Sequence, residues 1–254
     1  MRGPLRAVLL VGVVLLGGCA LRAPRPRAVR PASAEELLAV LAERRVAITT
    51  LRARARLRAG LRGVWMHEAL LVSRPDSVRI DVLSPFGLAL ALGARGALLW
   101  AFPAGEATRY EGSATPANLT RFLGAPVSVP DIVDVLLGLP PAREPAGRPT
   151  AAPTREGEHR LTVPLANGVQ TIWFAGDTLA VLRAEEERGG AVALRVGFGD
   201  YRDGFPHALD IGVPASGAEA TLAYDAVEPN APVDPVLFAP PTASRVLPLE
   251  AAPG

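Results

Sequence analysis

Hydrophobic and polar residues alternate along much of the chain, which predicts a protein built mainly from half-buried β-strands. In the clearest case, 51–59, Leu and Ala occupy one face of the strand and four Arg occupy the other. Similar runs recur at short intervals between Gly- and Pro-containing turns, as in an antiparallel meander. The predicted strands are 51–59, 64–73, 77–83, 88–93, 97–102, 106–110, 159–164, 169–175, 178–186, 191–201, 207–213 and 219–226.

Three intervals have helical spacing instead. Ser33 and Glu36 form a capping-box pattern in front of a predicted helix over 34–46. Two further helices are predicted over 116–123 and 130–138, and a Pro-rich loop follows over 139–157. Because no break in composition separates the two β-rich halves, we expect a single domain over 34–250.

The N-terminus has the features of a secretory signal. A short basic segment precedes an apolar run over 8–16, which is shorter than the roughly 20 residues that span a bilayer. Cys19, the single Cys of the chain, directly follows Leu16-Gly17-Gly18. This arrangement resembles the signal of bacterial lipoproteins, and an ordinary signal peptide or a buried Cys is the alternative.

The resemblance implies that 1–18 are removed and that Cys19 carries acyl chains. Residues 19–33, rich in Pro and Arg, are then an extended tether. Ala20 stands where an Asp would retain the protein at the inner membrane, so the implied location is the periplasmic face of the outer membrane. Three acyl chains are sufficient for stable anchoring.

Charge and composition exclude several classes of protein. The chain has 27 basic residues, all Arg, against 25 acidic ones, and two of the Arg lie in the predicted signal. The mature chain is therefore formally neutral, and we expect no nucleic-acid partner. The Arg face of 51–59 could bind phosphate on nucleic acid or lipid A. The favoured interpretation is a solvated strand face with acidic cross-strand partners, because no aromatic residues interleave with the Arg.

No enzyme motif is present. His67, His159 and His207 are isolated, and neither a nucleophile elbow nor a phosphate-binding loop occurs. Asp131 and Asp134 lie on one predicted helical face and could act as an acid–base pair, but we interpret them as a solvated helix start. Glu185-Glu186-Glu187 is interpreted as solvent-facing. We therefore expect no catalytic residue, metal site or cofactor.

The stretch 84–141 carries a family resemblance. Ser84-Pro85-Phe86-Gly87 precedes an alternating strand, Asn118 to Gly124 follows, and Val127 to Pro140 contains the predicted third helix. These segments resemble the LolB outer-membrane lipoprotein receptors and, more broadly, the LolA-like carriers. The resemblance implies a mainly β (α+β) fold, an antiparallel, incomplete β-barrel with helices covering an apolar concave face.

In that family, an apolar residue protrudes from the turn before the strand and helps place lipoproteins in the membrane. Here that residue is Phe86, and a ring folded onto the sheet edge is the alternative. Three apolar rows are candidate walls of an acyl-chain cavity, although a packed core would show the same pattern. The candidates are Val78, Ile80, Val82, Leu88, Leu90, Leu92, Leu98, Trp100 and Phe102.

The implied function is that of a membrane-anchored lipoprotein that accepts the acyl chains of other lipoproteins and helps place them in the outer membrane. The implied partners are the membrane itself, lipid or lipoprotein acyl chains, and a periplasmic LolA-like carrier. We expect a monomer. The alternative function is that of a non-catalytic assembly or structural lipoprotein of the envelope.

Overall fold

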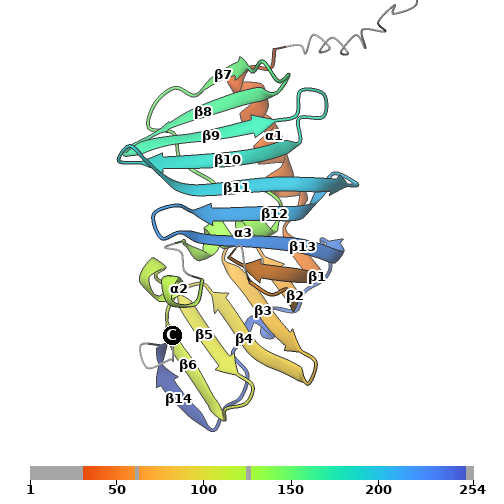
Figure 1. The fold of residues 1–254 in the computed structure, drawn as a ribbon, viewed down its shortest axis with the longest axis vertical. Helices are drawn as coiled ribbons and strands as arrows, with labels where there is room; N and C mark the ends of the chain where they lie inside the picture. The colour runs from red at the N-terminus through yellow and green to blue at the C-terminus, as the bar shows by residue number, and fades with distance from the viewer. Residues whose placement is uncertain (1–30, 61–62, 124–126, 250–254) are drawn as a thin grey trace, which may run out of the picture.

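The computed structural model describes residues 31–60, 63–123 and 127–249. Fourteen strands form one sheet, and three α-helices lie against it (Figure 1). The helices are α1 (Ala34–Ala47), α2 (Pro116–Leu123) and α3 (Val129–Leu136), and η1 (Pro235–Phe238) is a single 3-10 turn. The strands are β1 (Thr50–Ala59), β2 (Met66–Ser73), β3 (Ser77–Ser84), β4 (Gly87–Arg95), β5 (Leu98–Pro103), β6 (Thr108–Ser113), β7 (Thr150–Pro153), β8 (His159–Leu165), β9 (Gly168–Phe174), β10 (Val181–Arg188), β11 (Ala191–Arg202), β12 (Phe205–Val213), β13 (Ala218–Pro229) and β14 (Arg245–Pro248).

Two antiparallel meanders, β1 to β6 and β7 to β13, form the sheet, and β1 joins them at its centre. Its strand order is β14-β6-β5-β4-β3-β2-β1-β13-β12-β11-β10-β9-β8-β7. β1 pairs antiparallel with β2 on one side and with β13 on the other, so two halves distant in sequence share one hydrogen-bonded ladder. This pairing joins the two halves of the described chain into one sheet.

The sheet curls without closing. Its edge strands, β14 and β7, are not paired with each other in the described residues. The predicted antiparallel meander is confirmed except at β14, which pairs parallel with β6. β7 also falls within the segment predicted as a loop, because its four residues are too short for a pattern to be visible.

The helices cover the concave side of the sheet, and in Figure 1 α1 runs behind the upper strands. α1 has the predicted capping box between Ser33 and Glu36, and it buries Leu37 and Leu41 in the core. α2 contributes Leu119 to the same core, and α3 contacts β2 and β3. No helix of the described residues is long and apolar enough to cross a membrane.

A buried polar network anchors α3, contrary to the predicted solvated helix start. Asp134 is ion-paired with Arg74, and its second carboxylate oxygen accepts the backbone N–H of Ala142 at 2.7 Å. The guanidinium of Arg45 lies 3.8 Å from the same oxygen. A carboxylate this well paired is not available as an acid–base catalyst, so Asp134 has a structural role.

The expectation that Glu185-Glu186-Glu187 faces solvent is wrong for Glu186. Glu186 is buried, because it lies two residues from the buried Ala184 and so shares its concave face. Arg143 joins it to α3: the guanidinium donates to Glu186 at 2.8 Å and to Asp131 at 2.6 Å. Glu187, the next residue, is exposed as predicted.

Among the described residues, those of the core and the partly buried ones packed around it lie between Ala32 and Leu249. They come from α1, α2, α3 and the concave sides of strands in both halves of the sheet. A chain that begins at Ala20, after the predicted lipidation site, therefore retains every residue of this described core.

Candidate functional site

The candidate site is an apolar strip on the concave side of β1 to β4. Register places these side chains in continuous cross-strand rows: Leu57 opposite Met66, Val82 opposite Leu90, and Ile80 opposite Leu92. All six are partly exposed, whereas Leu70, Val72 and Val78, deeper on the same face, are buried. We call these six residues the concave strip: Leu57, Met66, Ile80, Val82, Leu90 and Leu92.

The third predicted row does not belong to this strip. Leu99 pairs with Ala94, and Ala101 pairs with Leu92, so these two β5 residues face the concave side. Leu98, Trp100 and Phe102 alternate with them and therefore face the convex side. Their placement as cavity wall is corrected, because a strand's own pattern does not show which of its faces turns inward.

Trp100 instead belongs to a small second core on the convex side. Its side chain is 0% exposed, and its indole N–H donates to the carbonyl of Phe238 in η1 at 3.1 Å. The ring lies directly over Gly93, where an added Cβ would come within 2.2 Å of a ring carbon. The C-terminal segment thus covers an aromatic residue that would otherwise be exposed.

Leu88 also departs from its predicted row. A β-bulge lies between Val82 and Leu83, so Leu88 stands opposite Leu83 while Leu90 stands opposite Val82. The extra residue changes the alternation, and Leu88 leaves the face that Leu90 and Leu92 share. Leu83 and Leu88 are well exposed on one face, and Val82 and Leu90 are partly exposed on the other. The end of this hairpin is therefore apolar on both sides.

Phe86 stands at the tip of the β3–β4 hairpin, and 99% of its surface is exposed. The turn is held from below by Ser84, whose hydroxyl accepts the Phe86 N–H at 3.2 Å and donates to the Gly87 carbonyl at 3.0 Å. Gly87 has φ of 112°, which a residue with a Cβ rarely adopts. The ring does not fold onto the sheet edge, so that alternative is excluded.

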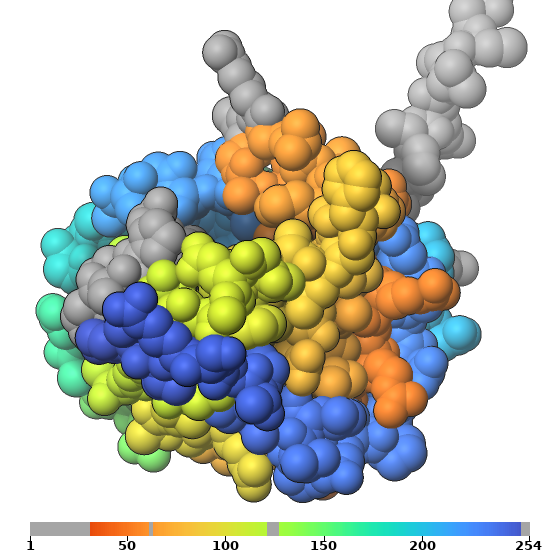
Figure 2. Space-filling model, turned by 90° about the horizontal axis from the view of Figure 1, so that it is seen from below, coloured from red at the N-terminus to blue at the C-terminus, as the bar shows by residue number. Residues whose placement is uncertain are grey.

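The β1–β2 turn lies beside this hairpin. β2 pairs with β3, which brings His67 opposite Leu83, and the two turns project on the same rim of the molecule (Figure 2, orange and gold). Val64 and Trp65 of the β1–β2 turn are also exposed. An exposed apolar group of this kind is typical of a surface that contacts another molecule or a membrane.

A carboxyl group interrupts the apolar strip. Glu68 is 3% exposed on the concave side, opposite Ala55 and Val82, and no hydrogen bond or ion pair reaches it from the described residues. Burial raises the pKa of Glu68 from 4.5 to about 7. Its protonated form can donate a hydrogen bond to an ester or amide carbonyl at this position.

We predict that Glu68 makes the protein less stable as pH rises. The pKa of the folded protein is the higher one, so between pH 4.5 and 7 the unfolded chain loses a proton that the folded chain keeps. Glu68→Gln should therefore have little effect at pH 4 and raise the free energy of unfolding by about 3 kcal/mol at pH 8. Urea denaturation at both pH values measures this, with the exposed Glu219→Gln as control. An equal gain at both pH values would contradict it.

Sequence reasoning missed Glu68, Met66 and Leu57 as residues of the site. The signal was present, because Glu68 alternates with Leu70 and Val72 on one strand face. The described residues hold no cluster of acidic, His or Cys side chains suited to a metal ion, and the three His of the sequence belong to none. Cys19 lies outside the described residues.

Comparison with known proteins bears on the fold. No protein-family model matches the sequence, and no curated protein matches it. Among solved structures, a LolA superfamily protein from Nitrosomonas europaea is similar over 82% of this chain and 98% of its own, with a TM-score of 0.55 and 14% identity. The chain has the LolA fold.

Two further structures agree with this assignment. An outer membrane lipoprotein-sorting protein domain from Vibrio parahaemolyticus has a TM-score of 0.54 at 14% identity, covering 81% of this chain and 97% of its own. A DUF1329 family protein from Desulfovibrio piger has a TM-score of 0.53 at 12% identity, covering 81% and 95%. The expected architecture, a curled antiparallel sheet with helices over its concave side, is confirmed for this LolA-fold protein.

Proposed function

We propose that this LolA-fold protein is a membrane-anchored, lipid-binding lipoprotein. It accepts the acyl chains of other lipoproteins on its concave strip and helps place them in the outer membrane. The observation that carries the proposal is the position of Phe86, fully exposed at the turn between the two strands that supply Ile80, Val82, Leu90 and Leu92. Apolar surface left open on both sides of one hairpin suits alkyl chains, since their transfer out of water is favourable.

Membrane attachment is the second part of the proposal. Cys19, after Leu16-Gly17-Gly18, would carry the acyl anchor at the periplasmic face of the outer membrane. An anchored domain stays at the membrane surface, so the Phe86 turn needs to add only a weak, reversible contact. A periplasmic LolA-like carrier would deliver the cargo. Movement of an acyl chain between apolar surfaces breaks no covalent bond, so this function needs neither a catalytic residue nor a cofactor.

Mass spectrometry tests both parts. The intact mass of the protein extracted from membranes should equal that of the chain from Cys19 onward plus its acyl groups, and Cys19→Ala should lose them. In native spectra, a chain that begins at Ala20 should take up a synthetic triacylated cysteinyl peptide. If the folded chain takes up no acylated peptide, the protein is a structural or assembly lipoprotein instead.

The chain provides a matched pair of variants for this test. Leu90→Glu places a charge on the concave strip and should abolish uptake, whereas Leu88→Glu, two residues away on the opposite face, should preserve it. Because Leu90 is partly exposed, its substitution should lower uptake much more than thermal stability. Parallel loss of uptake and fold in Leu90→Glu would indicate a packed core rather than a binding surface.

A further inference from the structure

The four Arg on the convex side of β1 are not equally neutralised. Arg52 lies 3.7 Å from Glu228, and Arg56 donates to Asp225 at 3.0 Å, which supports acidic cross-strand partners for these two Arg. Arg54 and Arg58 form no ion pair with any acidic residue of the described chain. Paired and unpaired Arg therefore alternate along the row, and Arg58 is the unpaired one beside the β1–β2 turn.

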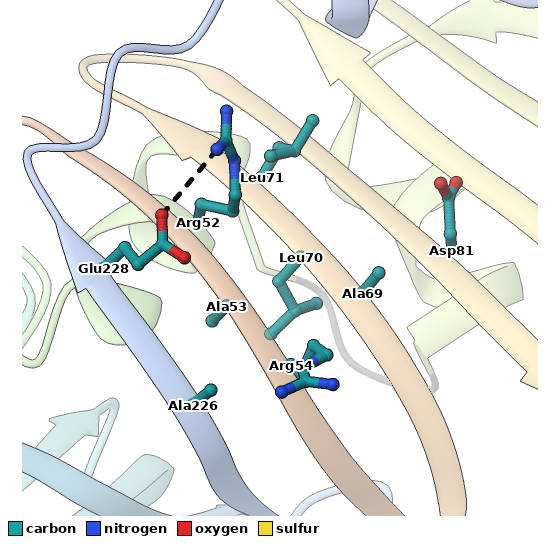
Figure 3. A pocket seen from close by; sticks show the side chains of 9 residues that line it. All are labelled: Arg52, Ala53, Arg54, Ala69, Leu70, Leu71, Asp81, Ala226 and Glu228. Carbon is teal, nitrogen blue, oxygen red and sulfur yellow. Dashed lines mark ion pairs between the residues drawn. The ribbon is translucent and has the colours of Figure 1, made fainter.

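Arg54 stands between two hollows of the convex surface. One, of about 400 Å³, runs from Arg52 to Asp81, and Figure 3 shows Arg54 beside it with no ion pair. The other, of about 560 Å³, reaches to His67 and to the base of the β3–β4 turn at Ser84 and Pro85. Three of the acidic residues that line them are paired with other Arg: Asp81 with Arg79 at 2.9 Å, Asp225 with Arg56, and Glu228 with Arg52. The fourth, Glu68, lines the second hollow without an ion pair, and burial raises its pKa to about 7, which favours its neutral form. An anion entering either hollow would find a free guanidinium.

Arg58 is held against an exposed aromatic ring. Its guanidinium carbon lies 5.1 Å from the centre of the Trp65 ring, and that of Arg56 lies 5.7 Å away. The Nε of Arg58 is buried and has no acceptor. Thr221 of β13 stands opposite Arg58, and its hydroxyl donates to Asp210 of β12 at 3.0 Å. No ion pair joins Asp210 to Arg58 in the described chain. Arg58 thus keeps both its charge and unused donors.

This basic surface and the apolar turns occupy one rim of the molecule. Trp65 belongs to the β1–β2 turn, beside the hairpin that carries Phe86 (Figure 2). Trp prefers the boundary between hydrocarbon and headgroups, and Arg recognises phosphate oxygens with several donors at once. With Phe86 in the hydrocarbon, Trp65 and the two unpaired Arg would face the headgroup region, because they lie on the strands that lead away from the turns.

We propose that Arg54, Arg58 and Trp65 bind the phosphate of anionic phospholipid headgroups and so orient the domain with Phe86 toward the bilayer. This inference rests on the proposed function for its membrane and adds the lipid class that the protein recognises. The binding is electrostatic, so it weakens as salt rises.

Vesicle binding tests the proposal. The chain that begins at Ala20 is titrated with phosphatidylcholine vesicles that either contain or lack phosphatidylglycerol, at low and at physiological salt. The wild type should prefer the anionic vesicles, and salt should reduce that preference. Removing both charges in Arg54→Gln/Arg58→Gln should lower affinity for the anionic vesicles roughly 20- to 30-fold. Arg52→Gln, on the same face but already paired with Glu228, is the matched control.

Each outcome decides the question. Equal binding of the wild type to both kinds of vesicle overturns the proposal, and this measurement needs no variant. A folded double variant that keeps the preference overturns it as well. Preference for an oligonucleotide over anionic vesicles would assign the surface to nucleic acid. Phe86→Ala should weaken binding to both kinds of vesicle alike, which separates insertion from headgroup recognition. Failure of acyl uptake would overturn the carrier function without changing this result.

Discussion

Phe86→Glu should abolish the transfer of acylated cargo into vesicles while leaving the fold and the uptake of cargo intact. Burial of one Phe side chain stabilises by about 1.5 to 3 kcal/mol, and a carboxylate at the same position makes insertion unfavourable. The ring is 99% exposed, so its removal costs no packing. Transfer of a fluorescent triacylated peptide from the protein to vesicles, followed beside thermal unfolding, measures the effect.

The matched control for this prediction is Val46→Glu. Val46 is 80% exposed at the end of α1, next to the start of β1, whereas the Phe86 turn adjoins the other end of that strand. The Val46→Glu variant should transfer cargo like the wild type, because it removes exposed apolar surface far from the rim that carries the Phe86 turn. Transfer that survives Phe86→Glu would show that the turn is not an insertion device. Unfolding of that variant would show that the ring belongs to the core.

Asp134→Ala should lower the free energy of unfolding by about 3 to 5 kcal/mol, because it leaves buried positive charge without its partner. Arg74 and Arg45 both face this carboxylate, and the Ala142 N–H loses its acceptor. The network joins α3 to the chain before and after it, so its loss should loosen the helix that covers β2 and β3. Chemical denaturation measures the difference.

Glu228→Ala provides the comparison for Asp134. It breaks an ion pair with Arg52 in which both side chains are well exposed, and such pairs contribute about 0 to 1 kcal/mol. A loss from Asp134→Ala no larger than that from Glu228→Ala would mean that solvent reaches the network and that α3 is held by its apolar face alone.

Local pattern was sufficient for most of the elements, and it indicated Phe86 as the tip of a turn. Strict alternation identified β1, and the capping box predicted at Ser33 is present. Val78, Ile80 and Val82 share one face because alternate residues of a strand always do. Phe86 could be expected to protrude because a two-residue turn has no room to fold a ring back. These features depend on neighbours in sequence, and the amino-acid order contains them.

The tertiary structure alone decided which faces turn inward and which charges are matched. Leu98, Trp100 and Phe102 share a face as expected, but the pairing of Leu99 with Ala94 turns that face outward, where Phe238 covers Trp100. One bulge moves Leu88 away from Leu90, and one helix turns Asp134 toward Arg74. Alternation determines the relative faces within one strand, whereas register, bulges and partners distant in sequence determine the absolute ones. Alternation and turn motifs were therefore enough for most strands, for the cap at Ser33 and for four residues of the concave strip. The exposure of Phe86, the addition of Leu57 and Met66 to the strip, and the unpaired Arg54 and Arg58 followed from the folded arrangement, because register and partners distant in sequence decide them.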